Sequence, residues 1–239
     1  MATRVQTDSS LFFGGYDISG VFNAISLTVG GGGQDDTVFG DETVSNAAGL
    51  SALAFEGEGY WSSTEDAVIE ASLGIDSSST ILTVAPVNST KGQPTYFAPL
   101  QEAEYNPYNT GTVGEMLAFR VSGTGRGTPV SGDIYVAPGT NRTTSGTSTP
   151  PVQQGSVSAT QKVYSSLHVL SASGTLDVTV KSDESGFSSP TTRITHEEFS
   201  SIGAEIKSAD GPIADDYWRV DFTISAGGSF DFIVSLGIT

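Results

Sequence analysis

The sequence predicts an all-β fold: a β-sandwich or barrel with one short helix and a long loop, followed by a small C-terminal β-sandwich. Glycine is abundant, with 29 among 239 residues, and runs of helix-favouring residues are scarce. Short segments of alternating polarity recur between clusters of Gly, Ser, Thr, Pro and Asn. That pattern is typical of sandwiches and barrels.

In the first half of the chain, strands are expected at residues 21–29, 51–60, 81–85, 113–122 and 132–137. In the second half, they are expected at residues 162–171, 175–181, 193–197, 203–207, 217–225 and 229–236. In residues 51–60, Leu53 and Phe55 share one face, and Glu56 and Glu58 share the other. An antiparallel sheet with one face in water has this alternation.

Residues 64–73 are the one helix expected in the first half, with Thr64 as its N-cap and acidic residues in its first turn. A short helical turn is expected at residues 197–202.

A long polar loop is predicted at residues 35–49. Connections of this length without secondary structure are usually functional or disordered. Apolar residues, among them Val38 and Phe39, are spaced among its acids and glycines, and Leu50 follows it. We therefore expect the loop to contact a partner surface.

A change of composition divides the chain. Residues 139–158 are rich in Gly, Ser, Thr and Pro and have almost no large apolar side chains, which predicts a linker or long exposed loop. The expected domains are therefore residues 1–138, with an N-terminal arm, and residues 159–239.

The net charge of −17 comes from 27 acidic and only 10 basic residues. Charged residues are 15% of the chain, below the roughly 25% of ordinary domains, so the imbalance reflects missing Lys and Arg. Such a surface will not grip nucleic acid, because phosphate contacts need cations. An ordinary acidic protein, a surface that stays near DNA without sticking, and adaptation to high salt all fit this charge.

The sequence contains no cysteine, which excludes disulfides and thiolate metal sites. No apolar run is long enough to span a membrane, and the first residues lack the apolar core of a signal peptide. We therefore expect synthesis in the cytoplasm and no membrane span.

Few residues suggest catalysis. His168 lies within an expected strand, and His196 lacks the spacing of a zinc-binding motif. A Ser-His-Asp triad stays open because serine is common, but no G-x-S-x-G motif supports one. Adjacent acids indicate solvated surface rather than a glycosidase pair. The sequence therefore predicts no catalytic, cofactor-binding or metal-binding residue and no enzyme.

Several short motifs follow one another along most of the chain, each at one position. The first part has Asp-Ile-Ser at 17–19, Phe-Gly-Asp at 39–41, Gly-Leu at 49–50, Glu-Gly-Tyr-Trp at 58–61 and Tyr-Asn-Pro at 105–107. The second has Leu-His-Val at 167–169, Thr-Leu-Asp-Val-Thr-Val at 175–180 and Tyr-Trp-Arg-Val at 217–220. In this order the motifs resemble the major tail tube proteins of long-tailed, siphovirus-like viruses of prokaryotes.

The resemblance implies a structural virion protein of the tail, without cofactors. Its copies would form hexameric rings that stack into a tube, meet other tail proteins at the tube ends, and let DNA pass without specific binding. Glu56 and Glu58 are predicted to face the lumen. Contacts between subunits are predicted at Phe12, Phe13, Asp36, Val38, Phe39, Asp41 and Leu50.

Two other functions stay open. Aromatic residues in the Pro-rich stretch 93–109 are also compatible with a carbohydrate-binding β-sandwich on a virion or cell surface. A capsid decoration protein is the other alternative.

Overall fold

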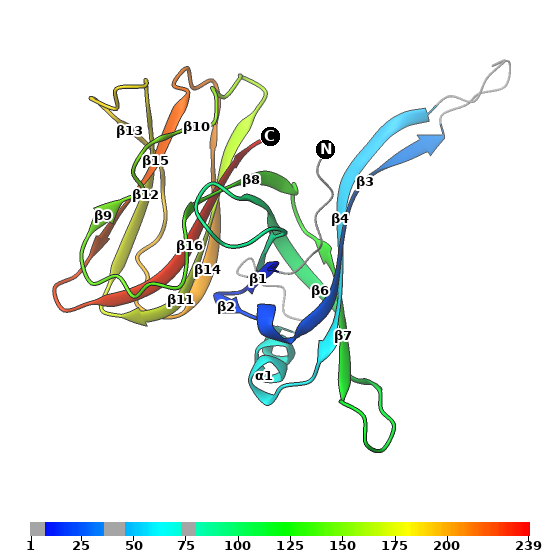
Figure 1. Cartoon of the computed structure of the whole chain (residues 1–239). Helices are drawn as coiled ribbons and strands as arrows, with labels where there is room; N and C mark the ends of the chain where they lie inside the picture. The colour runs from blue at the N-terminus through cyan, green and yellow to red at the C-terminus, as the bar shows by residue number, and fades with distance from the viewer. Residues whose placement is uncertain (1–7, 36–45, 73–79) are drawn as a thin grey trace, which may run out of the picture. The chain divides into compact units, whose positions relative to one another are not determined.

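The computed structural model describes residues 8–35, 46–72 and 80–239, and it confirms an all-β fold with antiparallel pairing (Figure 1). The chain forms two compact units, each described by itself below. Unit 1 comprises Met1–Gly20, Ser78–Phe97 and Val130–Thr239, and unit 2 comprises Val21–Ser77 and Ala98–Pro129. In the described ranges, no helix has both the length and the apolar character needed to cross a bilayer.

Unit 2 is a four-stranded antiparallel sheet in the order β3-β4-β7-β6, together with one helix. Its elements are β3 (Phe22–Asp35), β4 (Asn46–Tyr60), α1 (Ser63–Ser72), β7 (Ala118–Gly125) and the part of β6 (Pro94–Thr110) that begins at Ala98. The strands β3 and β4 include residues at both ends of the expected 35–49 loop. The remainder, residues 36–45, lies outside the described residues.

The apolar face of this sheet forms the core of unit 2. Leu53, Phe55, Phe119 and Val121 are buried, which confirms the face predicted for residues 51–60. The helix α1 begins at Ser63 rather than Thr64, and Ile69 is its buried residue. The Ser62 hydroxyl contacts the Glu65 carboxylate, so the cap lies two residues before the predicted Thr64.

Unit 1 contains two sheets. The first consists of β1 (Ser10–Phe13), β2 (Tyr16–Asp17), β5 (Ile81–Ala85), the Pro94–Phe97 part of β6, β8 (Val130–Val136), β11 (Lys162–Ser173), β14 (Gly203–Asp210) and β16 (Ser229–Ile238). A 3-10 helix, η1 (Ser19–Val21), follows β2. The second consists of β9 (Gly146–Thr147), β10 (Val152–Gln153), β12 (Leu176–Asp183), β13 (Thr191–Thr195) and β15 (Tyr217–Ile224).

The two sheets of unit 1 share one apolar core. Leu167 and Val169 of β11 and Phe232 of β16 belong to the same buried cluster as Val178 of β12 and Trp218 of β15. Facing apolar rows from two antiparallel sheets are the defining feature of a β-sandwich. Residues 197–202, expected to form a helical turn, contain bends and an isolated bridge at Phe199 instead.

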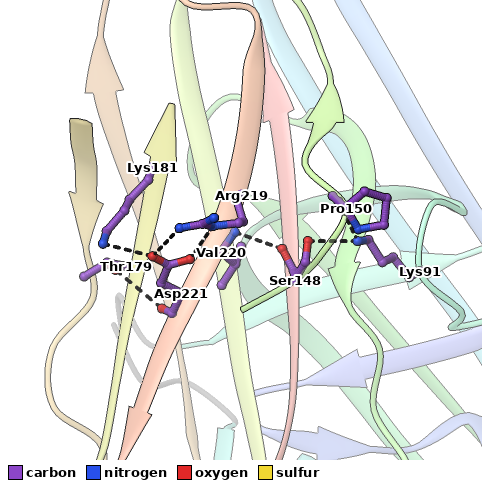
Figure 2. Close-up of polar contacts among 8 residues, drawn as sticks. All are labelled: Lys91, Ser148, Pro150, Thr179, Lys181, Arg219, Val220 and Asp221. Carbon is purple, nitrogen blue, oxygen red and sulfur yellow. Dashed lines mark hydrogen bonds and ion pairs between the residues drawn. The ribbon is translucent and has the colours of Figure 1, made fainter. Parts of the chain in front are cut away.

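The two compact units are not separated at residues 139–158, where the change of composition predicted a boundary. Residues 139–158, expected to be a linker, contribute β9 and β10 to the second sheet of unit 1. Ser148 exchanges hydrogen bonds with Val220 of β15, and Lys91 donates to the carbonyl oxygens of Ser148 and Pro150 (Figure 2). Two-residue strands are too short to show periodicity, so composition alone did not reveal them.

Candidate functional site

One face of the unit 2 sheet is polar and built from small side chains. The strand register aligns its residues in rows that cross β3, β4, β7 and β6 in turn. Nearly all of these side chains are exposed. The first row consists of Ala24, Glu58, Arg120 and Asn106, the second of Ser26, Glu56, Ser122 and Glu104, and the third of Thr28, Ala54, Thr124 and Gln101.

Glu56 and Glu58 lie side by side on this polar face and share one cation. The guanidinium of Arg120 is 3.3 Å from a carboxylate oxygen of Glu56 and 3.8 Å from one of Glu58. All three side chains are about half exposed, so these ion pairs add little to stability. Because Glu104 lies opposite Ser122 in the next strand, carboxylates outnumber guanidinium groups on the face.

Glu104 is the acidic residue of this face that the sequence analysis missed. It lies in β6, which was not predicted as a strand because Pro94, Pro99 and Pro107 interrupt its pattern. The spacing of Glu102 and Glu104 two residues apart was the available signal.

The strand β3 is an unprotected sheet edge. In the part of the chain that the structure describes, β3 pairs with β4 alone along its 14 residues. Its sequence, FNAISLTVGGGGQD, contains no lysine, arginine or proline. Natural proteins usually blunt such edges with charges, prolines or bulges, because open edges recruit other strands. The register of β3 against β4 shifts between Phe22 and Ala24 and between Gly31 and Gly33, and residues 24–31 form a regular stretch between these shifts.

The edge strand β14 of unit 1 shows the usual protection. Among the described residues it pairs with β11 alone, and it carries Glu205, Lys207 and Asp210 within eight residues. The contrast marks β3 as a strand whose edge is available for pairing.

Phe12 and Phe13 do not lie on the surface. They were predicted to contact another subunit, but both rings are buried within unit 1, where β1 pairs with β5. Phe12 packs with Ala85, Ile134 and Ile233. Neither ring is therefore exposed to a neighbouring copy.

The remaining predicted contact residues lie at the β3–β4 connection. Asp36, Val38, Phe39 and Asp41 fall outside the described residues. Leu50 belongs to β4. Their roles stay predictions.

His168 is a buried structural residue of unit 1. Its Nδ1 accepts a hydrogen bond from the Gly15 N–H at 3.3 Å, so its Nε2–H donates to the Thr83 hydroxyl at 2.8 Å. The Thr83 hydroxyl in turn contacts Ser166 at 3.2 Å. Complete burial lowers the pKa of His168 from 6.5 to about 3, so the ring is neutral at ordinary pH.

Ser165, His196 and Glu205 have the connectivity of a catalytic triad. The Ser165 hydroxyl lies 2.9 Å from His196 Nε2, and His196 Nδ1 lies 2.9 Å from a Glu205 carboxylate oxygen. However, Ser165 has no exposed surface, so a substrate cannot reach its hydroxyl. The arrangement therefore links β11 to β14 and does not form a nucleophilic site.

Glu205 is stabilised as a carboxylate by this network. Burial alone would raise its pKa, but hydrogen bonds from His196, the Glu197 N–H and Lys207 outweigh burial and lower the pKa.

A second charged cluster lies on the outer face of the five-stranded sheet of unit 1 (Figure 2). Arg219 makes a bidentate contact with Asp221 at 2.6 and 3.0 Å, and Lys181 contacts the same carboxylate at 2.9 Å. Burial would raise the pKa of Asp221, but these hydrogen bonds outweigh it and lower the pKa. Both cations of this cluster therefore share one carboxylate of the same sheet.

Neither a protein-family model nor a curated protein matches the chain. Several solved structures are similar to this chain at low identity. One is a chain from the virion of a native gene transfer agent particle. The match covers 53% of this chain and 97% of that chain, with 10% sequence identity and a TM-score of 0.43. Another is a chain from the sheath/tube terminator of an extracellular contractile injection system. The match covers 55% of this chain and 97% of that chain, with 11% sequence identity and a TM-score of 0.44.

A third is the SPP1 Dit protein, described as a paradigm of the hub adsorption apparatus in phages that infect Gram-positive bacteria. The match covers 98% of this chain and 100% of that chain. Its identity is 11% and its TM-score 0.38.

Proposed function

We propose that this protein is a structural subunit of the tail of a prokaryotic virus. Copies of it form rings, expected to be hexameric, that stack into a tube for the passage of DNA. The observation that carries this proposal is the long unprotected edge β3, in a sheet with one polar face and one covered apolar face.

An open edge of this kind favours pairing between copies. Within unit 2, the sheet begins with β3 and ends with β6, and the five-residue strand β5 pairs with part of the other side of β6. The two edges are therefore β3 and the part of β6 that β5 does not cover. Pairing of β3 in one copy with β6 in the next is a head-to-tail contact, which closes into a ring when the rotation fits. Such a ring continues the sheet from one subunit to the next.

The polar face suits the inside of that ring. The apolar face is already covered, because the Tyr105 hydroxyl of β6 donates to Asp66 of α1 on that side. The other face presents Ala, Ser, Thr and Glu side chains, with Arg120 held between Glu56 and Glu58. A wall of this kind gives DNA phosphates few cations to bind, so DNA slides without specific contacts.

The proposal places the protein in the virion tail, after synthesis in the host cytoplasm. Its partners are other copies of itself and the tail proteins at the tube ends. Asp36, Val38, Phe39, Asp41 and Leu50 are proposed to contact neighbouring copies.

Two lysine substitutions on β3 test the proposal. Val29 is 54% exposed and shares the apolar face with its partner Leu53, whereas Thr28 lies on the polar face. A lysine at Val29 would place a charge on the apolar face at the point where a strand of the next copy would continue that face, whereas a lysine at Thr28 would stay in solvent. We expect Val29→Lys to stay monomeric by light scattering and negative-stain microscopy, while Thr28→Lys still forms rings or hollow rods.

Unchanged assembly of Val29→Lys, or a wild-type protein that stays monomeric at every concentration, contradicts the proposal. Circular dichroism of both variants shows that the subunit itself is folded.

No specific observation favours the two alternatives. Of the four aromatic residues in the 93–109 stretch, Phe97 is buried and Tyr105 contacts α1, whereas Tyr96 and Tyr108 are exposed. In the charged cluster around Asp221, Arg219 and Lys181 both contact the Asp221 carboxylate.

A further inference from the structure

Five large apolar side chains are exposed at one end of the unit 2 sheet. Tyr60 is the last residue of β4 and Trp61 follows it, Tyr108 lies near the end of β6, and Val113 and Met116 lie in the turn from β6 to β7. We call these five residues the end patch. Tyr60 is aligned with Ala118, and the Trp61 N–H donates to the Leu117 carbonyl at 2.8 Å. Backbone contacts therefore hold the two halves of the patch together.

The turn itself displays its apolar residues. The Glu115 N–H donates to the Thr112 carbonyl at 3.0 Å, and Gly114 has a φ of +97°. This geometry is that of a type II turn, in which glycine takes the third position and Val113 the second. Val113 is fully exposed and Met116 is 65% exposed.

An ordered turn with apolar residues at its apex has a solvation cost that polar residues would avoid. Contiguous exposed apolar side chains of this kind mark interaction surfaces in soluble proteins. Tyr108 is 64% exposed and extends the patch along β6. Residues 58–72 and 108–119 contain no lysine or arginine, so a partner would be held by apolar contact.

The opposite end of the same sheet supplies a suitable partner. Along β3 and β4 the register runs from Phe22 and Gly59, near the end patch, to Asp35 and Asn46 at the other end. Figure 1 shows the β3–β4 hairpin and the β6–β7 turn leaving unit 2 at opposite ends. The residues between Asp35 and Asn46 include Val38, Phe39 and Val44.

We infer that the end patch binds residues 36–45 of a second copy in the adjacent ring. The inference rests on the proposed ring stacking and names the surface that receives the next ring. A sheet whose strands run along a tube presents one end to each neighbouring ring. An apolar patch at one end and apolar residues at the other make a head-to-tail contact that repeats without limit.

Disulfide trapping tests the contact, because the chain has no cysteine of its own. In the full-length double variant Phe39→Cys/Met116→Cys, mild oxidation of assembled protein should give a ladder of covalent multimers on a non-reducing gel. Each single variant should give no ladder. The matched control Phe39→Cys/Thr223→Cys places the second cysteine on an exposed position of unit 1, and it should give none either.

Two aspartate substitutions in one turn provide a second readout. Val113→Asp should give separate rings with loss of long rods, while Thr112→Asp, which replaces an exposed polar neighbour, should give normal rods. Rods without a ladder, or normal rods from Val113→Asp, overturn the end-patch contact and leave ring assembly standing. Wild-type protein that forms neither rings nor rods overturns both proposals together.

Discussion

At the scale of single residues, His168 links the stability of unit 1 to pH. The folded protein keeps its ring neutral through burial and through contacts with Gly15 and Thr83. The unfolded chain binds a proton at His168 below pH 6.5, whereas the folded chain does so only near pH 3. The unfolded state therefore gains protons first as the pH falls, and stability declines across that window.

The first prediction compares wild type with His168→Gln, whose side chain cannot take up this proton. Between pH 7 and pH 5, His168 should contribute a loss of about 2 kcal/mol to the free energy of unfolding. Urea denaturation at both pH values measures the slope, so a constant packing cost of glutamine cancels. Equal slopes in the two proteins would show that His168 is not the group responsible.

At the scale of elements, two glycines decide how the unit 2 sheet packs. The Phe22 ring crosses β4 and makes an edge contact with Phe119, with centroids 5.1 Å apart. A Cβ atom on Gly57 would lie 2.3 Å from that ring, and one on Gly59 would lie 2.1 Å from the Val21 carbonyl oxygen. The glycines that interrupt the apolar face of β4 therefore make room for the preceding strand.

The second prediction uses a pair of Gly→Ala substitutions in this sheet. Gly59→Ala forces a backbone shift and should lower the free energy of unfolding by about 1–3 kcal/mol. Gly30→Ala, in the same sheet with no atom near the new Cβ, should be neutral or stabilise by up to about 1 kcal/mol. Thermal or urea unfolding measures both, and equal effects would contradict the close approach at Gly59.

At the scale of the whole molecule, the charge is unevenly distributed. Residues 21–77 and 98–129, which make up unit 2, contain 13 acidic and two basic residues, whereas the full chain has 27 and 10. Assembly through unit 2 therefore brings like charges together. Salt screens that repulsion, because the Debye length falls from about 30 Å at 0.01 M to about 3 Å at 1 M.

The third prediction is that self-assembly increases with ionic strength. Sedimentation or light scattering should show mostly small species at about 0.01 M NaCl and rings or rods at about 1 M. Potassium chloride at equal ionic strength should act alike, and sucrose of equal osmolarity should not. Assembly that is equal or stronger at low salt would contradict this account.

Local pattern predicted much of the fold. Residues 81–85 form a strand with the expected bounds, and the alternation of Leu53 and Phe55 with Glu56 and Glu58 gave the correct faces. These features depend on period-two spacing, which is visible within a few residues. The strand β6 was missed because its prolines break that spacing.

The sequence by itself determined the all-β class, the polar face that holds Glu56 and Glu58, and the shortage of cations, since each follows from composition or from neighbouring residues. Tertiary structure decided that Phe12 and Phe13 are buried, that residues 139–158 add strands to the second sheet of unit 1, and that β3 ends as an open edge. Each of these depends on which distant segment lies beside a residue. Burial and strand pairing are properties of two segments together, so neither is encoded in the pattern of one.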